Sequence, residues 1–159
     1  MVNGRPYAPL QLADFIILPE VRESLDSLKK QGFKLVLVTN QPDLSTGRQT
    51  EVGLRQMHDY LCSQCPIDLI KVCGHTDADQ CGCRKPNPGM LLEAANELDI
   101  LVSKSFMVGD RWRDVEAGQR AGCQETFFID YHYDEQKPSG SYTAAKSLRE
   151  CVNKILEIK

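Results

Sequence analysis

The sequence lacks any apolar run long enough to cross a membrane, and its first residues show neither the charged nor the apolar region of a signal peptide. It also lacks an excess of positive charge, because 19 Lys and Arg residues stand against 22 Asp and Glu residues, for a net charge of −3. This balance argues against a nucleic-acid-binding surface. Internal repeats and low-complexity tracts are absent as well. We therefore expect a cytoplasmic protein whose partners are neither membranes nor nucleic acids.

Cysteine, in contrast, is abundant, with seven residues in a chain of 159. The number is odd and several cysteines have metal-like spacing, so we expect a reducing compartment rather than a disulfide framework. Hydrophobic residues make up 42% of the chain and charged residues 26%, which is typical of a globular protein. This length corresponds to one ordinary domain with a substantial core. We expect residues 1–159 to form a single domain.

Three cysteines and one histidine fall within eleven residues, as Cys73-x-His75 and Cys81-x-Cys83. Thiolate and imidazole are the ligands of structural zinc sites, and four is the coordination number of such sites. The spacing is tighter than in zinc fingers, so the match concerns ligand chemistry and not a finger motif. The alternative is four unrelated residues in a polar loop, but this loop has no core for buried cysteines to join. We therefore predict a zinc loop at residues 73–83.

Strand-like and helix-like segments alternate along the chain after an extended stretch at residues 1–19. Residues 33–38 form a mostly apolar, β-branched run, which is typical of a strand buried on both faces of a parallel sheet. The repeated strand–helix order predicts a Rossmann-like α/β fold, a parallel sheet with helices on both faces. The expected strands are 33–38, 68–73, 105–110 and 126–129, and the expected helices are 20–31, 50–65, 88–98, 112–121 and 147–158.

Local signals predict how two of these helices begin and which face is buried. Thr50 is expected to cap the helix at 50–65, and a Ser147-x-x-Glu150 capping box is expected to open the last helix. Helical spacing in the first of these predicts an inward face composed of Val52, Met57, Tyr60 and Leu61.

Four polar residues stand at, or shortly after, the carboxyl ends of predicted strands: Thr39, Lys85, Asp110 and Asp114. Open α/β sheets bind ligands at that edge. A hydroxyl and a lysine suit phosphate oxygens, and a carboxylate suits Mg²⁺, so the set favours phosphoryl transfer. Each residue also has an interpretation without a catalytic role. Thr39 would cap a loop, Lys85 would be a solvated surface charge, and the two acids would stabilise a helix N-terminus. Only their joint order favours the functional reading.

At this point the residues match a known family. Residues 33–41, Arg84-Lys85-Pro86 and the Gly-Asp-x-x-x-Asp sequence at 109–114 resemble three motifs of the haloacid-dehalogenase superfamily of phosphatases. With the zinc loop, the chain is similar to the zinc-containing branch that acts on histidinol phosphate and heptose bisphosphate. The resemblance covers nearly the whole chain. It implies hydrolysis of a phosphate ester on a small sugar or polyol, with D-glycero-D-manno-heptose 1,7-bisphosphate as the leading substrate.

The resemblance also implies roles for individual residues. Thr39 and Lys85 would stabilise the transferring phosphoryl group, with Asn40 and Gln41 beside it. Arg84 and Tyr7 would approach the substrate, and Asp110 would ligate Mg²⁺. The zinc held by Cys73, His75, Cys81 and Cys83 would be structural and would hold the loop that presents Arg84 and Lys85. We expect the protein to act as a monomer.

Three further residues have roles that the sequence leaves open. Cys62 and Cys65 form a Cys-x-x-Cys pair at the end of a predicted helix. They would be a redox pair or would replace Cys73 and His75 as metal ligands, although the strand context of a thioredoxin-like motif is missing. Trp112 either packs in the core or flanks the substrate.

One motif of the family has no counterpart in this sequence. The family's first, central strand ends in Asp-x-Asp-Gly, which supplies the nucleophile, the general acid/base and part of the Mg²⁺ site. Asp77-Ala-Asp79 lies in the metal loop after no strand, and Asp130 has its next acid only four residues later, so neither replaces it. We hypothesise that Met1 is an internal methionine of a longer natural protein.

Without that strand, the sheet is expected to lack its centre. The strands ending at Asn40 and Asp110 would then each expose an apolar edge, which invites non-native pairing and costs buried surface. For the natural gene product we expect the enzyme, but for the chain as it stands the missing nucleophile favours a second function. This alternative is a zinc-stabilised protein that binds phosphate at Thr39, Asn40 and Lys85 without turning it over.

Overall fold

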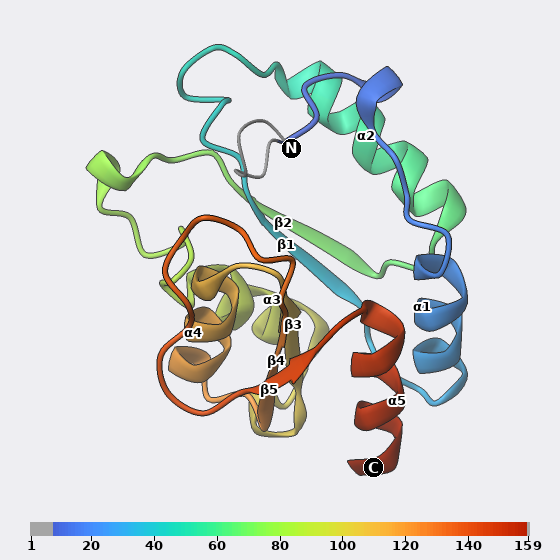
Figure 1. The fold of residues 1–159 in the computed structure, drawn as a ribbon. Coiled ribbons are helices and arrows are strands. Elements are labelled where there is room, and N and C mark those ends of the chain that lie inside the picture. Colours follow the sequence, from blue (N-terminus) through green and yellow to red (C-terminus); the bar gives the residue numbers. More distant parts are fainter. Residues whose placement is uncertain (1–7, 159) are drawn as a thin grey trace.

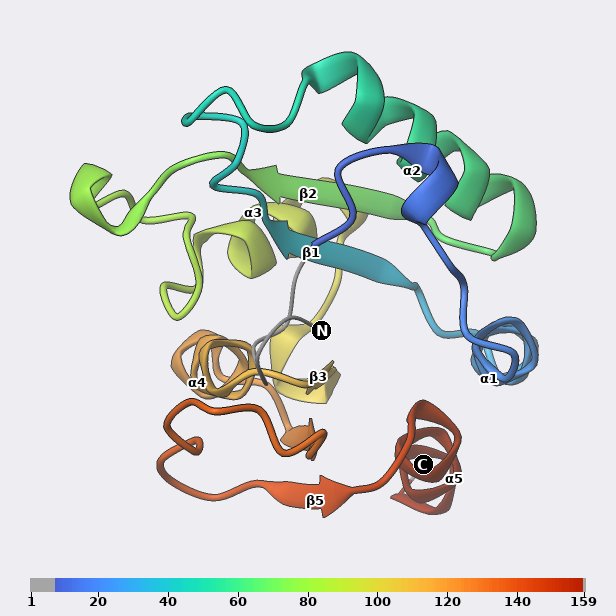
Figure 2. The same cartoon turned by 45° about the horizontal axis from the view of Figure 1, so that its top comes forward.

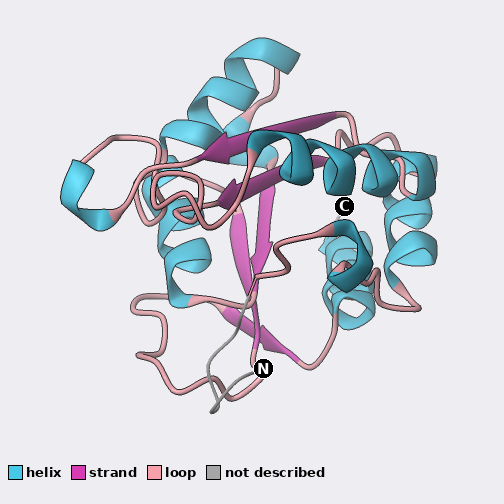
Figure 3. Ribbon diagram, turned by 90° about the horizontal axis from the view of Figure 1, so that it is seen from above, coloured by secondary structure: helices cyan, strands magenta, loops and turns pink. Residues whose placement is uncertain are grey.

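The computed structural model describes residues 8–158, and within them the strands form two separate parallel sheets. The first sheet pairs β1 (Val36–Asn40) with β2 (Leu69–Cys73). The second has the order β3 (Phe106–Gly109), β4 (Glu125–Ile129) and β5 (Thr143–Ala145). Figures 2 and 3 show the sheets as distinct groups, and β1 and β3 are the strands that face each other. The described strands therefore have the interrupted parallel arrangement that the sequence predicts.

Helices cover both sides of these strands (Figure 1). On one side lie α1 (Val21–Lys30), α2 (Glu51–Gln64) and α5 (Leu148–Ile158), and α1 packs against α5. On the other lie α3 (Gly89–Leu98) and α4 (Trp112–Ala121), which contact each other and the strands. Three 3₁₀ turns complete the described part, at Leu12–Asp14, Asp77–Asp79 and Val102–Lys104. The three-layer α/β/α prediction is confirmed, and no described helix is long and apolar enough to cross a membrane.

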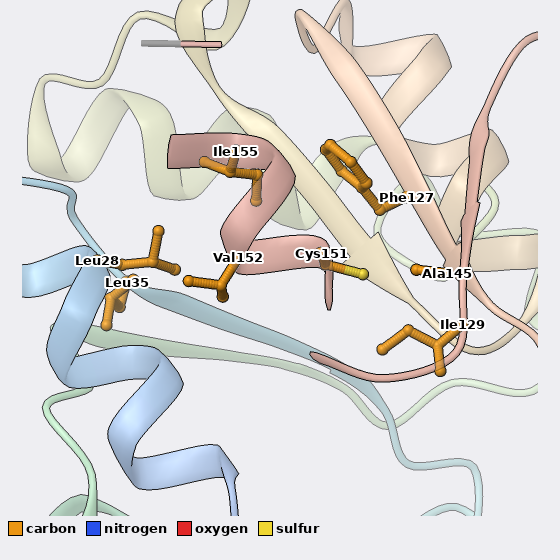
Figure 4. Packing of buried hydrophobic residues seen from close by; sticks show 8 residues of the cluster. All are labelled: Leu28, Leu35, Phe127, Ile129, Ala145, Cys151, Val152 and Ile155. Carbon is orange, nitrogen blue, oxygen red and sulfur yellow. The ribbon is translucent and has the colours of Figure 1, made fainter. Parts of the chain in front are cut away.

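The buried core holds the two sheets together from the α1/α5 side. It combines Leu28 of α1 and Leu35 before β1 with residues of β4, β5 and α5 (Figure 4). The Phe33 and Phe106 rings also meet edge to face, with centroids 6.0 Å apart, and so link the segment before β1 to the start of β3. Burial of these side chains away from water is the main contribution to folding here. Side-chain packing therefore joins the two sheets where no described backbone ladder does.

Several sequence predictions need correction in detail. The strand expected at 33–38 runs instead from Val36 to Asn40, and its residues are only half-buried rather than buried on both faces. The reason is that β1 pairs on one side only among the described strands. The short strand β5 was not predicted, because three residues carry too little periodicity to be recognised.

Helix predictions are more accurate. Thr50 does cap α2, since its side chain accepts a hydrogen bond from the Gly53 amide. On α2, Met57 is buried as expected, but Val52 and Tyr60 are 68% and 43% exposed, so the predicted inward face is wrong by part of a turn. The buried partner of Met57 is instead Leu54.

The box at the start of α5 is half realised. Ser147 Oγ accepts from the Glu150 amide, whereas the Glu150 carboxylate accepts from the amide of Lys146 and not from that of Ser147. The first half of the expected capping box is therefore confirmed and the second is shifted by one residue.

Candidate active site and zinc loop

The four predicted metal ligands converge at the carboxyl end of β2. The ligand atoms of Cys73, His75, Cys81 and Cys83 all lie within 4.8 Å of one another. Neighbouring sulfur atoms are 3.0 to 3.7 Å apart, and His75 Nδ1 lies 3.3 Å from Cys83 Sγ. Tetrahedral zinc, with Zn–S bonds of about 2.3 Å, needs ligand atoms at about this separation. The donor set therefore fits zinc in both chemistry and geometry.

The electrostatics of the cluster also favour a cation. Burial would raise the pKa of the Cys81 thiol, but hydrogen bonds from the Arg84 amide and the neighbouring thiols lower it to about 6. Burial and the contacts with Cys73 and Cys81 raise the pKa of Cys83 to about 12. Three thiolates in this volume repel one another unless a metal ion balances their charge. Cys62, which is exposed, and Cys65 lie outside the cluster, so their predicted alternative role as ligands is not supported.

The zinc loop is docked against the start of α3 by backbone contacts. The Gly89 amide donates to the Gly82 carbonyl at 3.0 Å, and Asn87 Nδ2 donates to the Cys81 carbonyl at 2.8 Å. A Cβ atom on Gly89 would lie 2.4 Å from the Gly82 oxygen, so only glycine allows this approach. The loop thus delivers the next two residues, Arg84 and Lys85, to a fixed position.

Asn40, at the end of β1, holds Lys85 by its backbone. The Asn40 side chain accepts from the Lys85 amide and donates to the Lys85 carbonyl, each at 3.1 Å. A side-chain amide has both a donor and an acceptor, so it can bracket one residue in this way. The contact joins two segments 45 residues apart, and it explains why an asparagine follows the strand.

The Lys85 side chain is buried, at 7% exposure, so its interpretation as a solvated surface charge is wrong. Its ammonium group lies 2.7 Å from Asp114 Oδ1 and donates to the Val38 carbonyl at 2.7 Å. An ammonium has three N–H donors, so these two partners leave one for a ligand oxygen. Lys85 is thus a fixed, partly coordinated cation at the edge where β1 faces β3.

Thr39 and Gln41 lie beside this cation at the end of β1. Gln41 Nε2 donates to Thr39 Oγ1 at 3.0 Å, so the hydroxyl acts as acceptor and keeps its own proton for another partner. Both side chains are half-buried. Thr39, the predicted phosphate-binding residue, is therefore the chain neighbour of Asn40, which holds Lys85. The Thr39 hydroxyl can donate to an anion.

Asp110 and Asp114 form the acidic part of the site after β3. Asp114 Oδ2 accepts from the Arg111 amide at 3.0 Å, so Asp114 caps α4 as well as pairing with Lys85. Burial raises the pKa of Asp110, and the nearby Asp114 carboxylate raises it further. A hydrogen bond from Tyr133 acts in the opposite direction. A Cβ on Gly109 would lie 2.2 Å from that of Asp114, so glycine is required for the close approach. The two carboxylates are hard oxygen donors, which are the ligands that Mg²⁺ prefers.

Sequence reasoning missed two residues of this region. Tyr133, in the loop after β4, donates its hydroxyl to Asp110 Oδ2 at 2.8 Å, and the same loop is tied to Arg111 by Glu135. Arg113 pairs with Asp77 of the zinc loop and stacks on Trp112, with its guanidinium carbon 4.6 Å from the ring centroid. Tyr133 lies in no recognisable motif, whereas Arg113 occupies an unspecified position of the Gly-Asp-x-x-x-Asp sequence. Only the folded chain brings the two residues to the site. Trp112 is half-buried beneath Arg113.

The remaining predicted site residues are Arg84 and Tyr7. Arg84 Nε donates to Asp77 Oδ1 at 2.9 Å, and its Nη1 donates to the His75 carbonyl at 3.1 Å. Tyr7, like the rest of residues 1–7, lies outside the described part of the chain. The structure therefore brings together the candidates from β1, the zinc loop, β3 and α4.

Comparisons with known proteins agree with this arrangement. Residues 2–122 match the haloacid dehalogenase-like hydrolase family. A D-glycero-beta-D-manno-heptose-1,7-bisphosphate 7-phosphatase of Helicobacter pylori is 32% identical over 151 residues, which cover 91% of this chain and 86% of the relative. The Escherichia coli K12 protein of the same name is 36% identical over 123 residues, which cover 70% and 64% of the two chains.

Among solved structures, a D,D-heptose 1,7-bisphosphate phosphatase from B. bronchiseptica, in complex with magnesium and phosphate, superposes with a TM-score of 0.81. It is 26% identical, and the match covers 94% of this chain and 89% of that one. The family match extends over the zinc loop, β1, β2, β3 and the edge that carries Lys85. The chain belongs to the haloacid dehalogenase-like hydrolase family.

Proposed function

We propose that this protein is a Mg²⁺-dependent phosphatase of a small phosphorylated sugar, with D-glycero-D-manno-heptose 1,7-bisphosphate as its substrate. The observation that carries the proposal is the buried Lys85 ammonium, fixed by Asp114 and Val38 with one N–H donor left. The names of the relatives and of the solved structure support the choice of substrate.

The first task of the site is to hold a phosphate group. The Lys85 ammonium and the Thr39 hydroxyl can each donate to a phosphate oxygen, and the Asn40 bracket keeps Lys85 in place. Charge-assisted hydrogen bonds of this kind are the strong ones, and they are stronger still where water is excluded. These contacts matter for catalysis because phosphoryl transfer depends mainly on positioning the phosphate group and stabilising its negative charge.

The second task is to hold a divalent cation near the same phosphate. Asp110 would provide the carboxylate, with Asp114 nearby as a second negative charge, and Tyr133 would orient Asp110 through its hydroxyl. When bound, Mg²⁺ supplies charge neutralisation of the phosphate oxygens. The residues that fit it are hard oxygen donors, in contrast to the thiolates of the zinc loop.

Zinc, in this proposal, has a structural role. Cys73, His75, Cys81 and Cys83 would provide four ligands, which is the full set of a structural zinc site and would leave no position for substrate or water. Its effect is to fix the two residues that follow Cys83, namely Arg84 and Lys85. We propose a cytoplasmic monomer, because composition and the small phosphorylated substrate fit that setting.

Phosphate release in the presence of Mg²⁺ tests the proposal. Zinc-loaded protein would be assayed with heptose 1,7-bisphosphate and with histidinol phosphate, beside a Lys85→Met variant and a Lys71→Met control on β2. The 159-residue chain would be run beside a version that also carries the family's Asp-x-Asp-Gly strand. We expect Mg²⁺-dependent release from the heptose only by the version with this strand, and we expect that release to be lost in its Lys85→Met variant and kept in the control. Faster release from histidinol phosphate would overturn the substrate, and equal release by Lys85→Met would overturn the site.

A second function is favoured by one feature of the sequence. No Asp-x-Asp-Gly follows a strand, so the group expected to attack the phosphorus is not among the 159 residues. The alternative is therefore a zinc-stabilised protein that binds the phosphate at Thr39, Asn40 and Lys85 without turnover. Tight calorimetric binding of heptose 1,7-bisphosphate, with no phosphate released over hours, would favour this alternative.

A further inference from the structure

The loop between β4 and β5 brings Tyr133 to the carboxylate of Asp110. The Tyr133 hydroxyl donates to Asp110 Oδ2 at 2.8 Å, although the two residues are 23 positions apart in the sequence. The Tyr133 side chain is half-buried. A phenol has a single O–H donor, and here that donor is used on the carboxylate that is proposed to hold Mg²⁺. Tyr133 therefore contacts the metal site from outside the motifs that the sequence displays.

An ion pair fixes this part of the loop two residues after Tyr133. Arg111 Nε donates to Glu135 Oε1 at 2.6 Å, and Arg111 Nη2 donates to Glu135 Oε2. The Glu135 side chain is only 17% exposed. An arginine fork that binds both oxygens of a carboxylate sets the direction of both groups. Since Arg111 directly follows Asp110, the pair holds Tyr133 beside the carboxylate that it contacts.

The far end of the loop is tied to α4 (Figure 1). Gln119 Nε2 donates to the carbonyls of Ser139 and Ser141, each at 2.9 Å, and Ser139 Oγ donates to Glu116 at 2.9 Å. Such contacts oppose local opening of the loop. Because α4 begins two residues after Asp110, the loop and the carboxylate are attached to the same helix.

We propose that Tyr133 is a positioning residue for Mg²⁺ and that Glu135 acts through it, so that the loop fixes the Asp110 carboxylate before the ion binds and thereby raises its affinity for Mg²⁺. The inference rests on the proposed function and deepens it, because it assigns part of the metal affinity to a loop outside the motifs. Carboxylates that bind metals are commonly held by such hydrogen bonds. A carboxylate that is already fixed loses less rotamer freedom when the ion arrives.

A competing role for Tyr133 would have the opposite sign. If its hydroxyl occupied the carboxylate at the expense of the ion, its removal would strengthen Mg²⁺ binding. The contact favours positioning, because a neutral phenol leaves the negative charge of Asp110 available to a cation, whereas a lysine or an arginine in its place would neutralise it.

Glu135 has a second effect that the test must separate from the first. Without Glu135, the positive charge of Arg111 would be unbalanced next to Asp110 and would repel a cation whether or not Tyr133 is present. If Glu135 instead acts through Tyr133, its removal has no further effect once the Tyr133 hydroxyl is gone. A double-mutant cycle distinguishes the two cases.

The first experiment is calorimetric titration of zinc-loaded protein with Mg²⁺, both as the 159-residue chain and with the family's Asp-x-Asp-Gly strand. Where the two differ, the version with the strand decides. Tyr133→Phe should weaken Mg²⁺ binding about tenfold, the usual lower bound for loss of a partner of a metal ligand. Tyr131→Phe is the matched control, because Tyr131 lies in the same loop, with its ring centroid 5.8 Å from that of Tyr133, and no described residue shares a hydrogen bond with its hydroxyl. We expect no change in this control.

The second experiment separates metal affinity from chemistry and from folding. In the version with the strand, Tyr133→Phe should raise the Mg²⁺ concentration for half-maximal phosphate release about tenfold and leave the rate at saturating Mg²⁺ within about twofold. Glu135→Ala should weaken Mg²⁺ binding by roughly threefold to tenfold, and by no further factor in the Tyr133→Phe background. If Glu135→Ala fails to fold, Glu135→Gln takes its place in the cycle.

Several results would overturn the inference. Tighter Mg²⁺ binding by Tyr133→Phe would make Tyr133 a competitor of the ion, and unchanged binding, or an equal loss in Tyr131→Phe, would remove its positioning role. The same loss from Glu135→Ala in both backgrounds would mean that Glu135 acts by charge and not through Tyr133. No Mg²⁺ binding by the version with the strand would refute the inference together with the metal site. No phosphate release, with Mg²⁺ binding weakened as expected in Tyr133→Phe, would refute the phosphatase alone.

Discussion

The pair formed by Lys85 and Asp114 gives the most demanding prediction, because it links stability to the site. The two side chains are 9% and 8% exposed, and their charged atoms are 2.7 Å apart. Replacing Lys85 by Met removes the cation, keeps most of the side-chain volume and leaves a buried carboxylate unpaired. It also removes the donor to the Val38 carbonyl.

The expected loss in the free energy of unfolding is about 3–5 kcal/mol, the usual cost of breaking a buried ion pair from one side. This is a large fraction of the roughly 5–15 kcal/mol that stabilises a typical domain. Asp114→Asn keeps the shape of the side chain and an oxygen for the Arg111 amide, yet it leaves Lys85 unpaired. The double variant has no unpaired charge, so its loss should fall short of the sum by roughly 2 kcal/mol or more.

Urea unfolding of zinc-loaded protein at pH 7 measures these differences. Lys71→Met is the control, because Lys71 pairs with the exposed Glu97 and should lose only about 0–1 kcal/mol. The reasoning fails if Lys85→Met loses less than the control. It fails equally if the losses of Lys85→Met and Asp114→Asn simply add.

Three further predictions concern the same edge of the sheet. The pKa of Asp110 is higher in the folded state than in the unfolded state. Asp110 therefore stabilises the fold at pH values below its unfolded-state pKa, and this stabilisation is lost as the pH rises through its folded-state pKa. Asp110→Asn should therefore raise the Tm of Mg²⁺-free protein at pH 7, by roughly 2–4 °C for each kcal/mol relieved, while it abolishes Mg²⁺ binding; a lower Tm would contradict the assignment. Gly109→Ala should cost about 2–3 kcal/mol or more in urea unfolding because its Cβ would overlap Asp114, whereas Gly82→Ala, whose Cβ meets nothing within 4 Å, should cost less than about 0.5 kcal/mol; equal costs would contradict the packing argument. Removal of zinc by a chelator should lower the Tm and weaken phosphate binding, and an unchanged Tm at zero zinc content would exclude a structural role for the metal.

Much of the fold could be predicted from the sequence because its local signals are strong. The helix at Trp112–Ala121 begins and ends where the sequence predicts, since Asp114 lies in its first turn and Gly122 adopts a positive φ of 85° at its end. The errors lie where tertiary context decides. Val52 and Tyr60 share the helical spacing of core residues, yet both side chains are exposed, and Tyr60 meets the Phe15 ring edge to face and not the core.

The residues of the site likewise fall into those that local sequence signals predict and those that only the tertiary fold brings together. Cys73, His75, Cys81 and Cys83 could be found because metal ligation imposes residue types at short spacing. Tyr133 could not, because it meets Asp110 from 23 residues away, and a single tyrosine in a loop carries no periodic or motif signal. The functional importance of Lys85 was predictable from its motif, but its burial against Asp114 was not.

The most direct test of the central claim is ³¹P NMR of heptose 1,7-bisphosphate mixed with zinc-loaded protein and Mg²⁺. For a protein that also carries the family's Asp-x-Asp-Gly strand, the account predicts that the resonance of the 7-phosphate disappears, that inorganic phosphate and heptose 1-phosphate appear together, and that Lys85→Met produces neither. An unchanged spectrum with folded, zinc-loaded protein would contradict the phosphatase and favour the binding protein. Loss of the 1-phosphate instead would contradict the assignment of the 7-phosphate as the group that is hydrolysed.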